Sequence, residues 1–194
     1  MAELAAPVVS APELAARVEE IGAQIAADYA GRDPVLVGVL IGAIPFLADL
    51  VRAIDLPLEV DFLALTSFGD GSRVRLASDS AVPLTGRNVV VVATMVDTGL
   101  TMASILRLLE PRSCASVATV TLFDKSPRRI ADIPLTYRGF EVGDEFLIGY
   151  GLDYQGWFRN LGSVWAVMDL PAMTADPGVF AASLFGWLGD RLDP

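Results

Sequence analysis

The sequence predicts an α/β fold with a doubly wound parallel sheet. Short, strongly apolar runs such as residues 35–41 and 89–93 have the length and composition of strands that are buried on both faces. The segments between such runs carry apolar residues at helical spacing. Strands that alternate with helices in this way form parallel sheets. The chain has 194 residues, which is enough for one domain with a substantial core.

Four elements are expected in the first part of the chain. A helix is predicted over residues 12–29, because apolar residues recur at i, i+4, i+7 and i+11 from Leu14. An apolar run predicts a buried strand over residues 35–41. Helical spacing returns in residues 45–54, and residues 59–66 have the character of a second strand.

Residues 69–86 are the least regular part of the chain, being rich in glycine, serine and proline. A loop of this length in a compact domain is more often functional than not, so we expect it to form a hairpin-like flap or hood over a site. Three regular elements follow. They are a buried strand at residues 89–93, a helix at residues 100–110 and a strand at residues 116–123.

The C-terminal part differs from the rest in being a short and very apolar helix. Asp176 and Pro177 form a strong helix start, and the following residues up to 189 are mostly large and apolar. We expect this helix to pack on the domain or on a second subunit. The predicted organisation is therefore a domain over residues 1–170 with a helical extension over residues 171–194.

Composition limits the partners and the location of the protein. The net charge of −10 disfavours binding to nucleic acid and to anionic membranes. Although 53% of residues are hydrophobic, they are spread along the chain rather than gathered in a run of about 20 residues that would span a membrane. The first residues lack the basic and apolar pattern of a secretory signal, so none is expected, and the single cysteine, Cys114, excludes an internal disulfide. A cytoplasmic location is therefore expected.

The absence of histidine restricts the chemistry that side chains can perform. Acid–base catalysis at neutral pH most often uses histidine, so here it must fall to aspartate, glutamate, lysine or tyrosine. Cys114 lies among small residues, which favours an inert, partly buried thiol over a nucleophile.

The most informative segment is the strand at residues 89–93 together with the sequence Asp97-Thr98-Gly99-Leu100-Thr101, which opens the following helix. The first turn of a helix has free N–H groups and the positive end of the helix dipole, so it binds phosphate well. In an open parallel sheet, ligands also bind at the ends of such strands. The spacing alone leaves a second interpretation open, since Asp-Thr-Gly sequences also cap ordinary helices.

This segment resembles the phosphoribosyl diphosphate loop of type I phosphoribosyltransferases. Four further stretches, in the expected order, resemble the hypoxanthine-guanine branch of that family: residues 37–43, 62–69, 122–125 and 139–160. The resemblance covers residues 9–169. It implies the synthesis of a purine mononucleotide from a free base and a diphosphate sugar, with Mg²⁺ and without an organic cofactor.

The resemblance also implies roles for individual residues. Asp97 would act as a catalytic group that handles the proton on the purine ring nitrogen, and Lys125 would hydrogen-bond the 6-oxo group. Phe146 would stack on the base, and the backbone of Leu147 would reach its edge. Asp153 would lie close to the base and to the metal.

Two further groups of residues would bind the phosphates. The 5′-phosphate would lie on the loop formed by Asp97, Thr98, Gly99, Leu100 and Thr101. The pyrophosphate side would be formed by Ile41, Gly42, Ser67, Phe68 and Arg159.

Several positions depart from the family pattern. Two adjacent acids normally precede the loop, and here they are Ala93 and Thr94, followed by Met95 in place of a β-branched residue. Ile41 replaces a lysine and Phe68 replaces a tyrosine. Most of these changes remove a charge or a hydroxyl group on the ribose, metal and pyrophosphate side, which weakens the expectation that Mg²⁺ binds.

Three functions follow from this combination of retained and altered positions. The leading hypothesis is a repurposed enzyme that acts on a different, less charged small molecule. The alternatives are an authentic Mg²⁺-dependent hypoxanthine or guanine phosphoribosyltransferase and a non-catalytic subunit that binds a purine nucleotide. In each case the expected ligand is a small molecule resembling a purine nucleotide, and the family's habit predicts a homodimer or homotetramer.

Overall fold

The computed structural model describes residues 4–68 and 73–185, which form two compact units. One unit comprises Ala15–Asp144, and the other combines the N-terminal residues up to Leu14 with the residues from Glu145 onward. The larger unit contains a six-stranded sheet. Its strands are β2 (Val35–Leu40), β3 (Glu59–Phe68), β4 (Arg73–Ser78), β5 (Asn88–Val96), β6 (Ser116–Asp124) and β7 (Tyr137–Glu141).

The strand order is β4-β3-β2-β5-β6-β7, and every neighbouring pair is parallel except β3 and β4. The chain moves outward in one direction from β2 to β3 and in the other direction from β5 to β6 and β7. The order therefore reverses between β2 and β5, whose carboxyl ends lie side by side. In open parallel sheets this reversal leaves a crevice at the carboxyl ends, where ligands bind.

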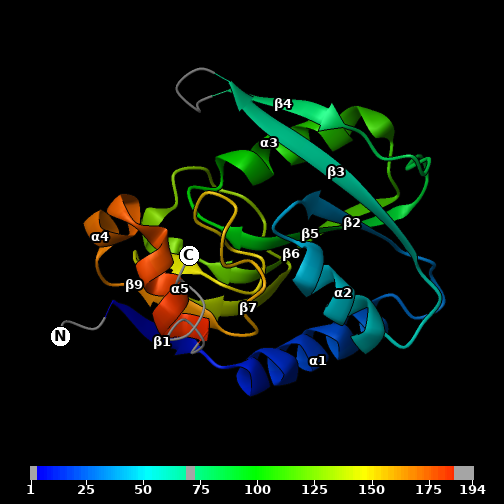
Figure 1. The fold of residues 1–194 in the computed structure, drawn as a ribbon. Coiled ribbons are helices and arrows are strands. Elements are labelled where there is room, and N and C mark those ends of the chain that lie inside the picture. Colours follow the sequence, from blue (N-terminus) through cyan, green and yellow to red (C-terminus); the bar gives the residue numbers. More distant parts are fainter. Residues whose placement is uncertain (1–3, 69–72, 186–194) are drawn as a thin grey trace. The chain divides into compact units, whose positions relative to one another are not determined.

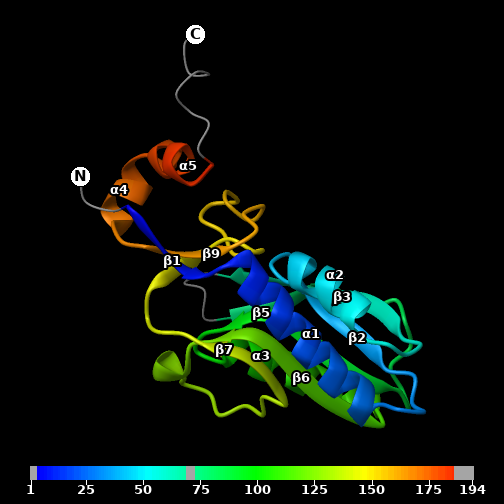
Figure 2. The same ribbon diagram turned by 90° about the horizontal axis from the view of Figure 1, so that it is seen from below.

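Helices cover both faces of this sheet (Figures 1 and 2). They are α1 (Ala11–Asp28), α2 (Ile44–Ala53) and α3 (Leu100–Leu109), with short 3₁₀ turns η1 (Glu110–Arg112) and η2 (Ser126–Arg128). Successive side chains of the central strands point to opposite faces of the sheet. Val37 and Val91 belong to an apolar cluster with Ile105 of α3, whereas a Cβ at Gly38 would lie 2.7 Å from Leu47 of α2.

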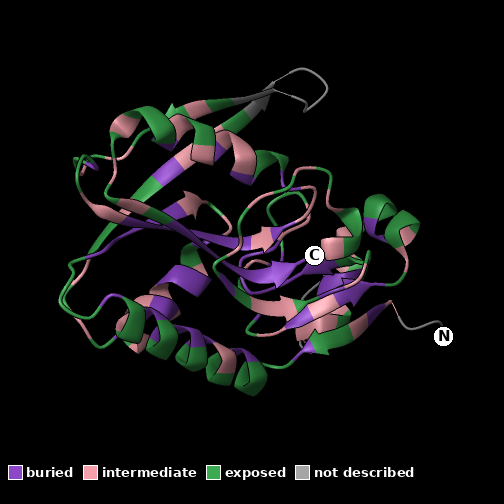
Figure 3. Ribbon diagram, turned by 180° about the vertical axis from the view of Figure 1, so that it is seen from behind, coloured by how far each residue is buried: buried purple, intermediate pink, exposed green. Residues whose placement is uncertain are grey.

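This alternation explains why the central strands are apolar throughout. Val35, Val37, Val89, Val91 and Val92 are all fully buried, and the strands of the sheet centre are drawn as buried in Figure 3. Cys114 packs at the margin of the cluster under α3 and is partly buried.

The predicted fold class is confirmed, and its predicted central strands correspond to β2, β5 and β6. Within the expected flap at residues 69–86, β4 pairs with β3 as an antiparallel hairpin, while residues 69–72 lie outside the described residues. The strand β7 was not expected, because its five residues include an arginine, a glycine and a glutamate and show no apolar run.

The smaller unit has a three-stranded antiparallel sheet in the order β1-β9-β8. Its elements are β1 (Ala5–Val9), β8 (Phe146–Ile148), β9 (Val164–Val167), α4 (Leu170–Ala175) and α5 (Pro177–Phe185). Phe180 and Ala181 of α5 are buried in a cluster with Phe158 and Met173. The predicted C-terminal helix thus begins at Pro177 as expected, and residues 186–189 of the prediction lie outside the described residues. The predicted boundary at residue 170 stays a prediction.

The segment after β4 is fastened to the sheet by two carboxylates. Asp61 Oδ2 accepts hydrogen bonds from Ser80 Oγ at 2.5 Å and from the Val82 N–H at 2.7 Å. Asp79 forms a two-point ion pair with Arg112, at 2.7 and 2.9 Å. Burial acts to raise the pKa of Asp61, but the hydrogen bonds from Ser80 and from backbone N–H groups outweigh it and hold that pKa below its ordinary value.

We predict that Asp61→Ala lowers the free energy of unfolding by about 1–3 kcal/mol, because two part-buried donors lose their acceptor. Since the pKa of Asp61 is depressed in the folded state, its stabilisation is present above the unfolded pKa and is lost as pH falls through the folded pKa. Urea unfolding at pH 7 and pH 3 measures both effects. The exposed Asp132 provides a control, and an Asp132→Ala variant as unstable as Asp61→Ala would contradict the prediction.

Candidate active site

The loop between β5 and α3 depends on a glycine. Gly99 precedes the helix with φ 82°, a left-handed conformation that side chains with a Cβ rarely adopt. A Cβ at this position would also lie 2.8 Å from the carbonyl oxygen of Ala131 and 3.0 Å from Cδ of Arg129. Both the backbone angle and the close approach of the neighbouring segment therefore require glycine.

The segment after β6 holds this loop in place through Thr98. The backbone N–H groups of Ile130 and Ala131 both donate to the carbonyl oxygen of Thr98, at 2.9 and 3.0 Å. The Lys125 N–H donates to the carbonyl of Val96 at 2.9 Å. Loop and segment consequently form one hydrogen-bonded support at the carboxyl ends of β5 and β6.

The start of α3 presents donors that the helix itself does not use. The Ala103 N–H donates to the carbonyl of Gly99 at 2.9 Å, as the first hydrogen bond of the helix. The N–H groups before it, from Gly99 to Met102, precede the regular helical ladder at the positive end of the helix dipole. Of these, the Leu100 N–H donates to Thr98 Oγ1 at 3.5 Å. Such a turn can bind an anion, and it contains the residues that the sequence predicted for the 5′-phosphate.

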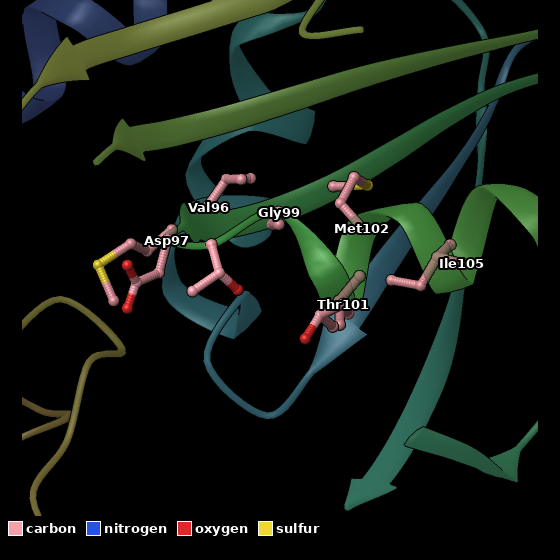
Figure 4. Close-up of a pocket in the computed structure, with 10 residues that line it drawn as sticks. Val96, Asp97, Gly99, Thr101, Met102 and Ile105 are labelled. Atoms are coloured by element: carbon pink, nitrogen blue, oxygen red, sulfur yellow. The ribbon is translucent and has the colours of Figure 1, made fainter. Parts of the chain in front are cut away.

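A cavity of about 160 Å³ adjoins the loop, and Figure 4 shows its lining residues on β5, the loop and α3. Ten residues line the cavity: Val39, Ala93, Met95, Val96, Asp97, Thr98, Gly99, Thr101, Met102 and Ile105. It therefore lies at the reversal of strand order, between the end of β2 and the end of β5. Its polar side chains all belong to the loop and to the first turn of α3.

Asp97 is the carboxylate of this cavity, and Arg128 lies beside it. Arg128 Nε is 2.8 Å from Asp97 Oδ1, while Arg128 Nη1 is 2.7 Å from Asp144 Oδ1. The contact with Asp97 is thus an ion pair to the carboxylate oxygen Oδ1. The Asp97 side chain is still 37% exposed, so a ligand N–H or O–H can reach it.

The same arginine shifts the pKa of its neighbours. Its hydrogen bond and its charge hold the pKa of Asp144 below the ordinary value. The hydrogen bond that Arg128 donates to Asp144, followed by the charge of Asp97, raises the pKa of Arg128 itself. Both members of the contact with Asp97 are partly exposed, with 45% and 37% of their side chains accessible, so salt will screen it.

Beneath the loop, Asp124 is buried with its charge compensated twice. It pairs with Arg129, whose side chain also lies against Gly99, and with Arg138 at 3.2 Å. The neighbouring Lys125 is 4% exposed, so the predicted base-binding lysine is a buried residue at the end of β6. Sequence reasoning missed Asp124, Arg128 and Arg129, although several charged residues directly after a buried parallel strand were an available signal.

The altered positions before the loop have distinct surroundings. Ala93 and Met95 line the cavity, whereas Thr94 is 4% exposed and donates from Oγ1 to the carbonyl oxygen of Gly42 at 2.7 Å. Thr94 therefore ties the end of β5 to the turn after β2. In that turn Ile41 is 59% exposed, and the Leu40–Ile41 peptide is cis.

Other residues predicted on the pyrophosphate side are placed only through their backbone. Ser67 and Phe68 are the last residues of β3 and pair with Val74 and Arg73 of β4. Their side chains lie outside what the structure describes.

The remaining predicted residues belong to the smaller unit. Phe146 is 37% exposed and makes an edge-on contact with Tyr154, with ring centroids 5.9 Å apart. Leu147, the next residue of β8, is buried. Asp153 and Arg159 are brought together as an ion pair at 2.7 Å, and Asp153 also accepts the N–H of Gly156 at 2.7 Å.

The donor groups do not fit a metal site made by the protein alone. Within residues 4–68 and 73–185, no group of three or more histidine, cysteine, aspartate or glutamate side chains is close enough to hold a metal ion. Asp153, the predicted metal neighbour, already pairs with Arg159. No helix in the described part of the chain is long and apolar enough to cross a membrane.

Comparison with known proteins decides the family. The model of the phosphoribosyl transferase domain matches residues 7–155. The hypoxanthine-guanine phosphoribosyltransferase of Bacillus subtilis (strain 168) is 39% identical over 158 residues, covering 79% of this chain and 88% of that protein. The chain belongs to the hypoxanthine-guanine phosphoribosyltransferase family. The enzyme of Streptococcus pneumoniae (strain R6) gives the same identity and coverage.

Solved structures of the same family agree with the fold. A hypoxanthine-guanine phosphoribosyltransferase from Bacillus anthracis superposes with a TM-score of 0.83 at 34% identity, covering 86% of this chain and all of that one (100%). A hypoxanthine phosphoribosyltransferase from Staphylococcus aureus gives 0.81 at 35% identity, covering 84% and 90%. The family and its type I fold, which the sequence predicted, are thereby confirmed, and the roles of single residues stay predictions.

We predict that Gly99→Ala disables the loop. The left-handed angle costs about 1–2 kcal/mol for a residue with a Cβ, and the contact with the Ala131 carbonyl adds to it. Calorimetry with GMP should show at least a tenfold loss of affinity. Gly86→Ala is the matched control, because Gly86 has φ 71° but nothing within 4 Å of its Cβ position. Equal effects of the two variants on GMP binding would refute the role of the loop.

We also predict that Arg128→Gln raises the pKa of Asp144 toward its ordinary value, since the arginine hydrogen bond and charge depress it. Carboxyl-carbon NMR titration measures the change, which should shrink in 1 M salt because the pair is exposed. Arg107→Gln, on the exposed surface of α3, serves as control. An unchanged Asp144 titration in the Arg128 variant would show that the ion pair does not form in solution.

Proposed function

We propose that the protein transfers a phosphorylated pentose from its diphosphate to a 6-oxopurine, hypoxanthine or guanine. The observation that carries the proposal is the loop Asp97–Thr101, which presents helix-start N–H groups beside a cavity at the reversal of strand order. The hypoxanthine-guanine phosphoribosyltransferases named among its relatives support this choice over the leading expectation of a repurposed enzyme. We also propose that the protein forms a homo-oligomer and is located in the cytoplasm.

In the proposed reaction, a bond forms between the purine ring nitrogen and the anomeric carbon of the sugar, while the bond from that carbon to the diphosphate oxygen breaks. The purine gives up a ring-nitrogen proton, and Asp97 would accept it, since it is the carboxylate that lines the cavity. Lys125 would donate to the 6-oxo group. Phe146, more than a third exposed, would offer a face for stacking.

Magnesium enters this proposal as a counter-ion of the diphosphate sugar. When bound it would neutralise charge on the departing diphosphate. The described carboxylates do not assemble a site for it, so any such ion would arrive with the substrate. The chain's own contribution is to bind the phosphate, orient the base and accept the proton.

One observation keeps the repurposed enzyme as a second candidate. Ala93 and Met95 give the proposed sugar side of the cavity an apolar surface, and the Thr94 hydroxyl donates its hydrogen bond to the Gly42 carbonyl. A less charged substrate would fit such a wall. A non-catalytic subunit that binds a purine nucleotide would use the same loop without turnover.

An activity assay separates these functions. Hypoxanthine, guanine and xanthine are incubated with phosphoribosyl diphosphate and Mg²⁺, and in parallel the affinities of IMP and GMP are measured. We expect turnover of hypoxanthine or guanine, and we expect Asp97→Asn to lower kcat by about 10²-fold or more while GMP affinity changes little. Nucleotide binding without turnover would indicate the binding subunit. The absence of both nucleotide binding and turnover would contradict the proposal and favour the repurposed enzyme.

A further inference from the structure

The cavity beside the loop has an unusual division between polar and apolar walls. Away from the loop the lining residues carry hydrocarbon or thioether side chains, namely Val39, Ala93, Met95, Met102 and Ile105. Three of these, Ala93, Met102 and Ile105, are at most 8% exposed and belong to the apolar cluster under α3. The wall is therefore a continuation of the protein core rather than a polar surface.

The polar side chains of the cavity are confined to Asp97, Thr98 and Thr101. Thr94, next to Ala93 on β5, does not contribute a hydroxyl to the wall, because its Oγ1 donates to the Gly42 carbonyl at 2.7 Å. A ligand whose phosphate lies on the N–H groups of the loop would thus have its next atoms against carbon. The side chains of this wall offer those atoms no hydrogen-bond partner.

This division has a direct consequence for a sugar. A hydroxyl group moved from water onto an apolar wall loses its hydrogen bonds and gains none, whereas a methylene group in the same position is stabilised by burial. Resting on the proposed function, we propose that this site recognises the phosphate and the carbon skeleton of the pentose but not its 2-hydroxyl. Its substrate class then includes 2-deoxypentosyl phosphates, which bind at least as well as the ribosyl compounds.

The test compares two nucleotides that differ by one hydroxyl group. Calorimetric titration of the full chain with GMP and with 2′-deoxy-GMP keeps base and phosphate constant. We expect 2′-deoxy-GMP to bind about fivefold more tightly, the lower end of what an unpaired buried hydroxyl costs. Tighter binding of GMP would overturn this proposal and leave the proposed function standing. Failure of both nucleotides to bind would remove the proposed function and this proposal with it.

Two serine variants locate the effect. Ala93→Ser adds a hydroxyl to the cavity wall and should shift the ratio of the two affinities at least threefold toward GMP. Ala118→Ser is the matched control, since Ala118 is a strand residue of equal exposure, 8%, that does not line the cavity. Melting temperatures confirm that both variants fold. An Ala93→Ser ratio equal to that of the parent would show that this wall does not face the sugar, which would overturn the proposal.

Discussion

The hydrogen bonds that converge on the carbonyl of Thr98 hold the candidate site together. Two backbone N–H groups, from Ile130 and Ala131, donate to this one oxygen. They force the segment after β6 against Gly99, which leaves no room for a Cβ and fixes the left-handed turn. The turn leads directly into α3, so its conformation sets the direction of the N–H groups in the first turn of that helix. The loop is therefore shaped by its neighbour as much as by its own sequence.

Charge compensation below the loop supports the same arrangement. Asp124 is buried, and a buried carboxylate is tolerated when it is paired and hydrogen-bonded. Its partners Arg129 and Arg138 come from the segment after β6 and from β7. Since the side chain of Arg129 also packs against Gly99, the ion pairs and the turn stabilise one another. Arg128, one residue earlier, reaches instead to Asp97 in the cavity.

Periodicity predicted the sheet well because the central strands are buried on both faces. A run such as Val89–Val92 is fully buried between helices on both faces of the sheet, with Val89 and Val91 packed in the cluster of α3. The strands β1, β7, β8 and β9 escaped prediction because they are three to five residues long and gain their stability from pairing rather than from an apolar run.

The loop Asp97–Thr101 could be predicted because its chemistry is local to a strand end and a helix start. The charged residues after β6 were a signal in the sequence, but their partners were not, because Arg128 meets Asp97 and Arg129 meets Gly99 across about 30 residues of chain. The same holds for Thr94. In the sequence Thr94 stands where the family pattern has an acidic residue. In the structure its hydroxyl forms a hydrogen bond to the turn after β2.

The most direct measurement is an amide NMR titration of the protein with inorganic phosphate. If the helix start after Gly99 is the phosphate site, the largest chemical-shift changes will fall on the N–H groups of Thr98 to Thr101 and will saturate together. The Gly99→Ala variant will lose them. Changes that concentrate elsewhere in the sheet, with these amides unmoved at saturating phosphate, would contradict the assignment of the site.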